Sequence, residues 1–262
     1  MKTQQFACAI VLMAAVAVVA MPVSAQMAPK EKSELAKRIE TALASNIRTA
    51  DERARDAKER KPVETLEFFG LQPNMTVVEL MPGGGWYTKI LGQVLADEGK
   101  LLVAIGGARL APKLKEWKLD KVEVADGTFE FKPTGQYGVM SIEKAENPVT
   151  NADMVLTFRN LHNFTPESRA KLNRTVFGML KPGGIYGVVD HTRRHMEPGT
   201  VENWRRLDPV VAIKEITDAG FEFVGFSDLH YRPDDELKYD SQRPTVAGYS
   251  DRFTLKFRKP AN

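Results

Sequence analysis

The stretch VVELMPGGGWYTKIL, residues 77–91, constrains the fold more than any other part of the sequence. A short apolar run reaches the carboxylate of Glu79, a cluster of glycines follows, and a helix-like segment comes next. Because Gly83 and Gly85 lack a Cβ atom, the backbone can turn sharply there and a ligand can lie directly against it. This order predicts a strand, a tight turn and a helix, which together form one unit of a parallel α/β sheet.

Short apolar runs continue to alternate with helical stretches after Met75. Strands are expected at residues 76–80, 101–105, 122–124, 154–158, 185–189, 221–226 and 253–257, and helices at residues 86–96, 110–117, 165–180 and 208–220. Residues 126–150 are expected to form an inserted hairpin. The alternation predicts a parallel sheet with helices on both faces, and the last two strands, which lack an intervening helix, are expected to be antiparallel neighbours. The loop 227–251 between them is long enough for either a lid or a plain surface segment.

The first 25 residues are interpreted as an export signal and not as part of the fold. Lys2 supplies a positive charge, residues 6–20 are almost wholly apolar, and residues 23–25 (VSA) form a small-x-small cleavage site. An uncleaved anchor is the alternative, but the apolar run is short for a membrane span. We therefore expect a periplasmic protein that begins near Gln26 and has no stable membrane insertion after signal cleavage.

The composition excludes several classes of site. Cys8 is the only cysteine, so the mature chain can form no disulfide, thiolate metal site or cysteine nucleophile. The formal net charge is +3 with both signs interspersed, which argues against a nucleic-acid partner. No helical His-x-x-x-His spacing exists, so no metal site is expected. The oligomeric state is left open.

Residues 26–70 are expected to form a helical N-terminal extension to an α/β domain of residues 71–262. One apolar stripe recurs every four residues, at Leu35, Ile39, Leu43 and Ile47. Thr49-x-x-Glu52 is a capping box that opens a second helix, which Pro62 breaks or restarts. Gly70 is expected to end the extension as a helix cap.

Three classes of ligand compete for the glycine cluster at the end of the first strand. A phosphate-gripping loop needs Gly-Lys-Ser/Thr, which is absent. A dinucleotide-binding fingerprint needs Gly or Ala at position 88 and an acid at the end of the second strand. The chain has Thr88 and Ile105 at these positions, which argues against this class. The third class has an acid at the end of the first strand, just ahead of the glycines, and Glu79 meets that requirement.

The segment ELMPGGGWYTKIL resembles the first motif of class I S-adenosylmethionine-dependent methyltransferases. More narrowly, it is similar to an exported bacterial group of predicted methyltransferases with the motif E-x-x-P-G-G-G-W-Y-T. Further segments resemble the same group in order: RDAKERKP, DMVLTFRNLHNF, LKPGGIYGVVDH, AGFEFVGFSDL, PDD and DRFTLKFRKP. The resemblance covers roughly residues 48–260. It implies a Rossmann-like class I methyltransferase fold, with a mostly parallel seven-stranded sheet and an antiparallel last strand.

The resemblance also implies S-adenosylmethionine as the cofactor. The implied cofactor-binding residues are Glu79, Pro82, Gly83, Gly85, Trp86, Tyr87 and Asn160. Two positions depart from the pattern, since Met81 replaces the usual first glycine and Ile105 replaces the acid that accepts the ribose hydroxyls. The loss of such a charge-assisted hydrogen bond costs about 1.5–3 kcal/mol, or roughly one to two decades of affinity.

Two loops carry candidate catalytic residues, because the carboxyl ends of parallel strands meet at one edge of the sheet. His162 follows the fourth strand, and Asp190 and His191 follow the fifth. Either histidine can take a proton near neutral pH, and the alternative for each is a hydrogen-bonded loop histidine. By resemblance, the segment with Asp56, Arg60 and Lys61 covers the ligand, and Arg159 and Asn163 are assigned with it to the substrate side. The alternative for the charged segment is a solvated helix face.

The leading hypothesis is therefore an exported methyltransferase that acts on a small molecule or an envelope component. The alternative is a periplasmic binding module that has lost or changed its cofactor, which Met81 and Ile105 favour. A dinucleotide oxidoreductase is a third interpretation, weakened by Thr88 and by the missing acid of the second strand. Binding of the cofactor separates the first two.

Overall fold

A computed structural model of the chain describes residues 31–147 and 149–261. The chain divides into a unit of residues 1–32 and a unit of residues 33–262, and the helices and strands of the described residues belong to the second. The expected export signal lies outside the described residues. Within the described ranges no helix is both long enough and apolar enough to span a bilayer.

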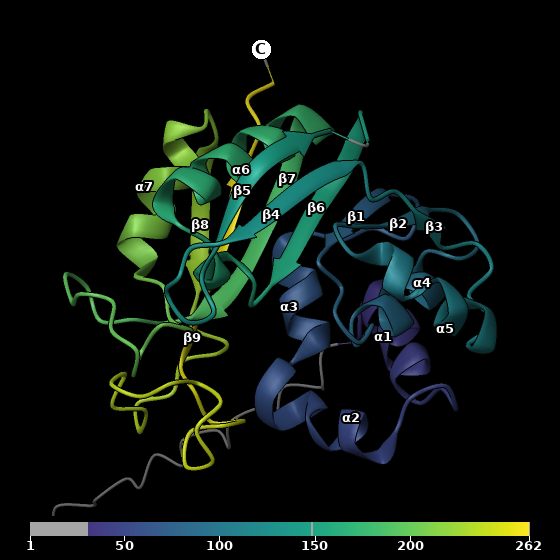
Figure 1. The fold of residues 1–262 in the computed structure, drawn as a ribbon. Coiled ribbons are helices and arrows are strands. Elements are labelled where there is room, and N and C mark those ends of the chain that lie inside the picture. Colours follow the sequence, from purple (N-terminus) through teal and green to yellow (C-terminus); the bar gives the residue numbers. More distant parts are fainter. Residues whose placement is uncertain (1–30, 148, 262) are drawn as a thin grey trace, which may run out of the picture. The chain divides into compact units, whose positions relative to one another are not determined.

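The described residues form one seven-stranded sheet with the strand order β3-β2-β1-β6-β7-β9-β8 (Figure 1). Its strands are β1 (Thr76–Leu80), β2 (Lys100–Ala104), β3 (Glu123–Val124), β6 (Ala152–Phe158), β7 (Leu180–His191), β8 (Glu222–Ser227) and β9 (Arg252–Arg258). The pairs from β3 to β7 are parallel, whereas β9 is antiparallel to both of its neighbours. The mostly parallel sheet and the antiparallel last strand are thus as predicted.

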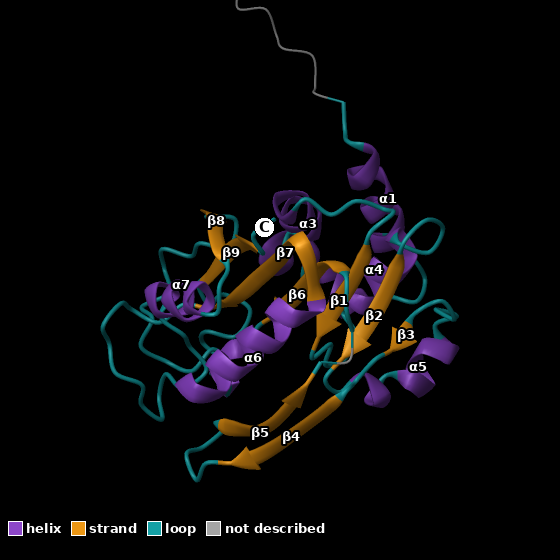
Figure 2. Ribbon diagram, turned by 90° about the horizontal axis from the view of Figure 1, so that it is seen from above, coloured by secondary structure: helices purple, strands orange, loops and turns teal. Residues whose placement is uncertain are grey.

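A separate hairpin lies between β3 and β6 in the chain. Strands β4 (Thr128–Pro133) and β5 (Met140–Glu146) pair antiparallel and form their own two-stranded sheet. Figure 2 shows this hairpin beyond the helix α6 (Pro166–Met179), away from the main sheet. The inserted hairpin predicted within residues 126–150 is confirmed.

Helices cover both faces of the main sheet. The α-helices other than α6 are α1 (Glu34–Leu43), α2 (Ala50–Ala54), α3 (Pro62–Phe69), α4 (Thr88–Val94), α5 (Ala111–Glu116) and α7 (Pro209–Asp218). Three short turns complete the set within residues 31–147 and 149–261: the π-helical η1 (Asp56–Arg60) and the 3-10 turns η2 (Gly107–Arg109) and η3 (Leu161–Asn163). Helices α1, α3 and α4 lie on one side of the sheet and α6 on the other (Figure 2).

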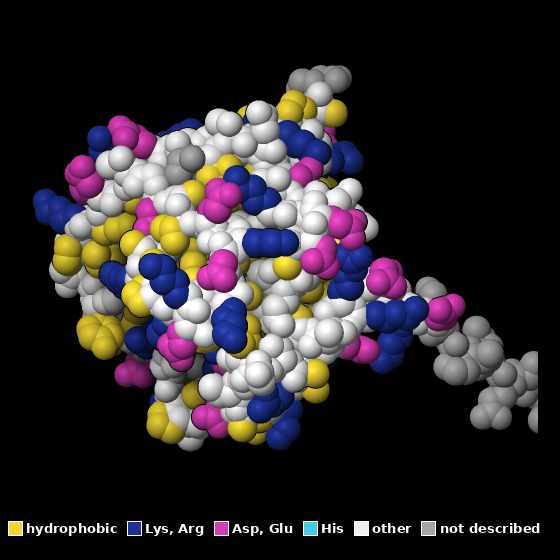
Figure 3. Space-filling model, turned by 90° about the vertical axis from the view of Figure 1, so that its right-hand side faces the viewer, with side chains coloured by type: hydrophobic (Ala, Val, Ile, Leu, Met, Phe, Trp, Pro, Cys, Tyr) yellow, Lys and Arg dark blue, Asp and Glu magenta, His cyan; other side chains and the backbone are white. Residues whose placement is uncertain are grey.

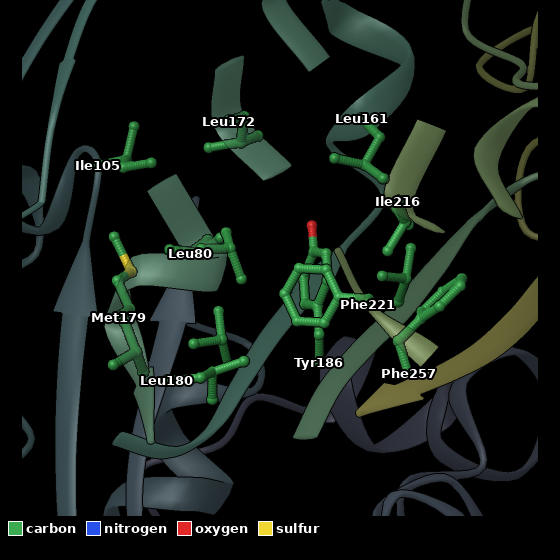
Figure 4. Close-up of a cluster of buried hydrophobic side chains, with 14 of the residues drawn as sticks. Leu80, Ile105, Leu161, Leu172, Met179, Leu180, Tyr186, Ile216, Phe221 and Phe257 are labelled. Carbon is green, nitrogen blue, oxygen red and sulfur yellow. The ribbon is translucent and has the colours of Figure 1, made fainter. Parts of the chain in front are cut away.

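The core consists of two apolar clusters, one on each face of the sheet. Neighbouring strand residues alternate between them, so Val77 belongs to the cluster with α1, α3 and α4, and Val78 to the cluster with α6 and α7. Figure 4 shows part of the second cluster, where the rings of Tyr186 and Phe221 lie 5.5 Å apart between centroids. This two-sided burial explains why the strands are apolar runs without a polar face.

The N-terminal helices share this core. Leu35 and Ile39 of α1 and Phe69 of α3 are buried in the same cluster as Val77 and Ile90 of the α/β unit. The expected capping box is present, since the Thr49 hydroxyl accepts from the amide of Glu52 and the Glu52 carboxylate accepts from the amide of Thr49. Outside the core, Figure 3 shows a face on which basic and acidic side chains are interspersed.

Two local predictions differ from the structure. The helix expected to continue from the capping box stops at Ala54, and the chain then makes the π-helical turn η1, with Lys61 in a left-handed conformation at φ 39° before Pro62 restarts the helix. Strand β7 begins at Leu180, five residues earlier than the expected 185–189, because Leu180 pairs with Ala152 of β6 and the backbones of Gly183 and Gly184 pair with Lys259. In η1 the Arg60 carbonyl accepts from the Tyr87 hydroxyl at 3.3 Å and the Glu59 carbonyl accepts from Arg252 at 2.6 Å, so contacts with distant segments accompany both differences.

Candidate functional site

The carboxyl ends of β1, β6 and β7 meet at one edge of the sheet. Leu80 pairs with Thr157 and Phe158 pairs with Val189, so the loops that follow these strands lie side by side. They surround a cavity of about 500 Å³, the glycine-loop cavity. Eleven of the residues selected from the sequence line it: Arg60, Glu79, Pro82, Gly83, Trp86, Tyr87, Arg159, Asn160, His162, Asn163 and His191.

The glycine loop presents bare backbone to this cavity. A Cβ atom added at Gly83 or Gly84 would meet no atom within 4 Å, although Gly83 has φ +57°. Gly85 differs, since a Cβ atom there would come within 2.7 Å of the Trp117 ring. Gly85 therefore lets the start of α4 pack against Trp117 and does not line the cavity, whereas Gly84, which the sequence did not single out, does.

Three strands end in a non-glycine residue with a left-handed backbone. Met81 follows β1 with φ 49°, Ile105 follows β2 with φ 59°, and Arg159 follows β6 with φ 64°. Such conformations cost free energy for residues other than glycine and gather at ligand sites. Met81 thus adopts the positive φ that the usual glycine would supply at no cost, and it lines the cavity.

The end of β2 is closed by a different carboxylate. Asp126 accepts hydrogen bonds from the amides of Gly106, Gly107 and Ala108 at 2.7–3.0 Å. Ile105 is buried in the apolar core and offers no polar group. The side of the crevice nearest β2 therefore lacks the free acid that a ribose diol would need, and its amides are already occupied.

Glu79 is a buried acid that lines the cavity, and it is 3% exposed. The Thr88 hydroxyl donates to its Oε2 atom at 2.6 Å. Burial raises the pKa of Glu79 to about 8, against the smaller opposing effects of the Thr88 hydrogen bond and the Arg60 charge. At neutral pH this side chain is therefore mainly a neutral carboxylic acid, able to donate as well as accept a hydrogen bond.

Trp86 and Tyr87 form an aromatic wall held by arginines. The guanidinium of Arg48 lies 4.9 Å from the Trp86 ring centroid and that of Arg60 lies 4.5 Å from it. Asp56 forms a two-pronged ion pair with Arg48 at 2.6 and 2.7 Å, so it supports this wall from behind and does not line the cavity. The Tyr87 ring stacks on Phe158 at 3.6 Å between centroids.

Lys61 is also outside the set of residues that line the cavity. It occupies the junction between η1 and α3, where its carbonyl accepts from the Thr65 hydroxyl at 2.7 Å. The π-helical turn places Arg60, and not Lys61, in the cavity. Of the three charged residues selected from this segment, the structure therefore brings one to the site.

His162 and Asp190 form a buried pair beside the glycine loop. The Nδ1 atom of His162 lies 2.5 Å from Asp190 Oδ1, and the His162 amide donates to Asp190 Oδ2 at 3.1 Å. The His191 amide donates to the same carboxylate at 2.7 Å. Asp190 is fully buried and does not line the cavity, so it orients the two histidine residues from behind.

The two histidines differ in their surroundings. The Nδ1 atom of His191 lies 2.9 Å from the Ser250 hydroxyl, and burial, followed by the charge of Arg252, holds the pKa of His191 well below its usual range. With Nδ1 of His162 engaged by the carboxylate, its Nε2 atom is the nitrogen left for a ligand. His162 is thus the better placed base, and His191 is a neutral neighbour at 5.6 Å between ring centroids.

Asn160 connects the two central strands at the cavity. Its side-chain amide donates to the carbonyl of Leu80 at 3.3 Å and to the hydroxyl of Thr157 at 3.1 Å. This bridge holds the loop after β6 against the end of β1. Asn163 lies in the same loop, within η3, and lines the cavity.

Sequence reasoning missed several residues that line the cavity, including Glu52, Arg55, Arg205 and Gln242. Glu52 had been recognised for its capping role, and its carboxylate also pairs with Lys89 at 3.0 Å. Arg55 lies in the charged segment that the resemblance selected. Arg205 and Gln242 come from loops without a motif, so no signal in the sequence identified them.

No protein-family model and no curated protein matches the chain. Solved structures match its fold. A SAM-dependent methyltransferase from Aquifex aeolicus is 17% identical, with a TM-score of 0.54 over 87% of this chain and 99% of that one. The [4+2]-cyclase SpnF is also 17% identical, with a TM-score of 0.54 over 84% of this chain and 86% of that one.

A third similar structure is human N-acetylserotonin methyltransferase in complex with SAM, 15% identical with a TM-score of 0.50 over 86% of this chain and 56% of that one. Together with the sheet order, these matches define the class: the chain has the Rossmann-like class I methyltransferase fold. Identities this low show the fold alone. Because one of these structures is that of a cyclase, the fold alone does not identify the reaction, which must be argued from the site.

Proposed function

We propose that this protein is an exported S-adenosylmethionine-dependent methyltransferase that acts on a small molecule or an envelope component. The observation that carries the proposal is one cavity that combines the open glycine backbone of Gly83 and Gly84 with the oriented base His162. The glycines leave room for a ligand against the end of β1. The His162–Asp190 pair supplies a proton acceptor at the same edge of the sheet.

The residues present fit the methionine end of the cofactor. Gly83, Gly84 and Pro82 form a cradle without obstructing side chains, Glu79 offers a neutral carboxyl group, and the wall of Trp86 faces the same cavity. When bound, the cofactor supplies an electrophilic methyl group on a sulfonium. The adenosine end fits less well, because Ile105 provides no acceptor for the ribose hydroxyls. We therefore expect the affinity for S-adenosylmethionine to be about one to two decades weaker than it would be with an acid at this position.

The chain's own residues perform three tasks in this proposal. Asn160 and the glycine loop hold the ligand site in register at the ends of β1 and β6. Asp190 accepts a hydrogen bond from Nδ1 of His162. The Nε2 atom is then left to take a proton from the nucleophile that accepts the methyl group. Trp86, Tyr87 and Gln242, which line the same cavity, would limit the access of water to a bound ligand.

Binding of S-adenosylmethionine and S-adenosylhomocysteine to the mature chain tests the proposal by calorimetry. Gly84→Val adds a side chain to the open cavity without a positive φ, so binding should be lost while the protein stays folded. Gly225→Val is the matched control, because Gly225 lies in the edge strand β8 and a Cβ atom there also meets nothing within 4 Å. Absence of binding of either compound up to millimolar concentrations would refute the methyltransferase.

Methyl transfer itself is tested by a radiolabelled methyl donor and a fractionated envelope extract. His162→Gln should abolish transfer while leaving cofactor binding within a few-fold, since the side chain is placed as the base and not as a cradle. Equal rates for this variant and the wild type would remove His162 from the mechanism. The proposed export is tested by cell fractionation and by the intact mass of the protein. The protein should be found in the periplasm, and its mass should correspond to a chain that begins near Gln26.

The second candidate is a periplasmic binding module with the same fold. The observation that favours it is the closed end of β2, where Asp126 occupies the amides of Gly106 and Gly107 and Ile105 offers no polar partner. A module of this kind would bind a ligand in the glycine-loop cavity but neither S-adenosylmethionine nor S-adenosylhomocysteine. Native mass spectrometry of the protein purified from the periplasm would reveal such a ligand.

A further inference from the structure

A second cavity adjoins the glycine-loop cavity on the side away from the glycines. It has a volume of about 290 Å³ and is called the arginine cavity here, because Arg55, Arg159 and Arg252 line it together with Ser241 and Ser250. No residue of the glycine loop lines it, whereas Arg55, Arg159, His191 and Gln242 line both cavities. A molecule that extends between the two cavities would pass Arg159.

The arginine cavity holds more positive than negative charge. Among the described residues, its one lining carboxylate is Glu59, which pairs with Arg55 at 3.0 Å and with Arg252 at 3.7 Å. The side chain of Arg159 makes no hydrogen bond or ion pair within residues 31–147 and 149–261. The cavity is therefore lined by three guanidinium groups and one acid that pairs with two of them, and His191 beside them is neutral because burial lowers its pKa.

Two residues that line this cavity also carry a buried polar atom without a partner among the described residues. The hydroxyl of Ser241, in a residue only 2% exposed, has no hydrogen-bond partner among the described residues. The Nε atom of Arg252, 5% exposed, has none either. Leaving such groups unpaired costs free energy, which a ligand with hydrogen-bond acceptors would recover.

The backbone at Arg159 is consistent with a ligand-binding role. Its φ of 64° is unfavourable for arginine, and its amide is held by the Val189 carbonyl at 2.7 Å. Burial, and then the charge of Arg55, lower the pKa of Arg159, against smaller opposing effects that include the charge of Glu59. Strain and unpaired charge at one residue mark it as a candidate for function.

We propose that the methyl acceptor is an anionic molecule whose carboxylate or phosphate group binds Arg159, Arg252 and Ser241 in the arginine cavity. The planar guanidinium of arginine matches both oxyanions, and a serine hydroxyl can donate a further hydrogen bond. The acceptor atom of the molecule would then extend into the glycine-loop cavity near His162. This inference rests on the proposed function and names the substrate class of that site.

Inorganic phosphate is the probe for this site. Its binding is measured by thermal unfolding of the mature chain at constant ionic strength. At 10 mM, phosphate should raise the melting temperature by about 3–5 °C relative to chloride, if the dissociation constant is about 1 mM. Arg159→Asn should weaken the binding of phosphate at least tenfold. Asparagine is chosen because it tolerates the left-handed backbone at this position. Ser241→Ala should weaken it severalfold.

The control is Arg174→Gln, which removes an exposed arginine of α6 outside both cavities and should leave the phosphate effect unchanged. The same titration is repeated with saturating S-adenosylhomocysteine, whose own carboxylate is the competing source of the oxyanion. If the two ligands bind together, and Arg159→Asn leaves S-adenosylhomocysteine affinity unchanged, the oxyanion belongs to the acceptor. Displacement of phosphate by S-adenosylhomocysteine would overturn the inference, as would an equal phosphate effect in wild type and Arg159→Asn.

The two proposals fail in different ways. If S-adenosylhomocysteine does not bind but the Arg159-dependent phosphate effect is present, the methyltransferase is refuted while the oxyanion site stands. If S-adenosylhomocysteine binds and phosphate has no effect even at 50 mM, the methyltransferase stands and the anionic acceptor is refuted.

Discussion

Replacing Glu79 with glutamine should change how the stability of the protein depends on pH. The side chain is 3% exposed, and burial raises its pKa from 4.5 to about 8 in the folded protein. Since the folded pKa lies above the unfolded one, the contribution of Glu79 to stability is complete below pH 4.5. It decreases as the pH rises and is lost once the pH passes about 8. At about 1.4 kcal/mol per decade, the full change is about 5 kcal/mol.

Glu79→Gln removes this titration while keeping the shape of the side chain and an acceptor for the Thr88 hydroxyl. Near pH 5 the variant and the wild type should be similarly stable. Near pH 9 the variant should be the more stable by several kcal/mol, because the wild type must then bury an ionised carboxylate.

Urea unfolding at 25 °C, followed at several pH values between 5 and 9, measures the difference. Glu64→Gln, at an exposed position of α3, is the control and should show no such dependence. A difference between Glu79→Gln and the wild type that stays constant from pH 5 to pH 9 would refute the reasoning, since it would mean that Glu79 does not hold a proton in the folded state.

Two further predictions concern the glycine loop and the buried carboxylate of Asp190. Gly85→Ala should lower stability by about 1–3 kcal/mol in urea unfolding, because its Cβ atom would meet Trp117 at 2.7 Å and φ is +80°. Gly84→Ala should change stability by less than about 0.5 kcal/mol, and equal losses in both variants would contradict the assignment of their roles. Asp190→Asn should lower the free energy of unfolding by about 1.5–3 kcal/mol, because it removes the carboxylate that accepts hydrogen bonds from His162. The melting temperature should fall by roughly 2–4 °C for each kcal/mol lost. An unchanged melting temperature would show that this carboxylate does not hold the loop.

Much of the α/β unit follows from local patterns. The strand at Thr76–Leu80 and the helix Pro166–Met179 are where the apolar runs and the Thr165 cap predict them. The antiparallel pair β8 and β9 follows from the absence of a helix between them. Local chemistry is sufficient here because caps, prolines and apolar runs act within a few residues.

Other features depend on contacts between distant segments. The sequence selected Asp56 and Lys61 for the site together with Arg60, but only the π-helical turn decides that Arg60 lines the cavity. Gly85 belongs to the glycine motif by position, yet its role depends on Trp117, more than thirty residues away in the chain. The arginine cavity gathers Arg55, Arg159 and Arg252 from three separate segments, which no spacing in the sequence indicates.

The sequence by itself determined the order of strands and helices, the open glycine backbone at the end of β1 and the histidines at the neighbouring strand ends. These properties are encoded in residues close together along the chain. Only the tertiary structure decided which nitrogen of His162 is held by Asp190, that Glu79 keeps its proton at neutral pH, and that three arginines and one acid line the same cavity. The physical reason is that hydrogen-bond geometry, burial and the summed electrostatic field depend on the distances that packing sets between remote residues.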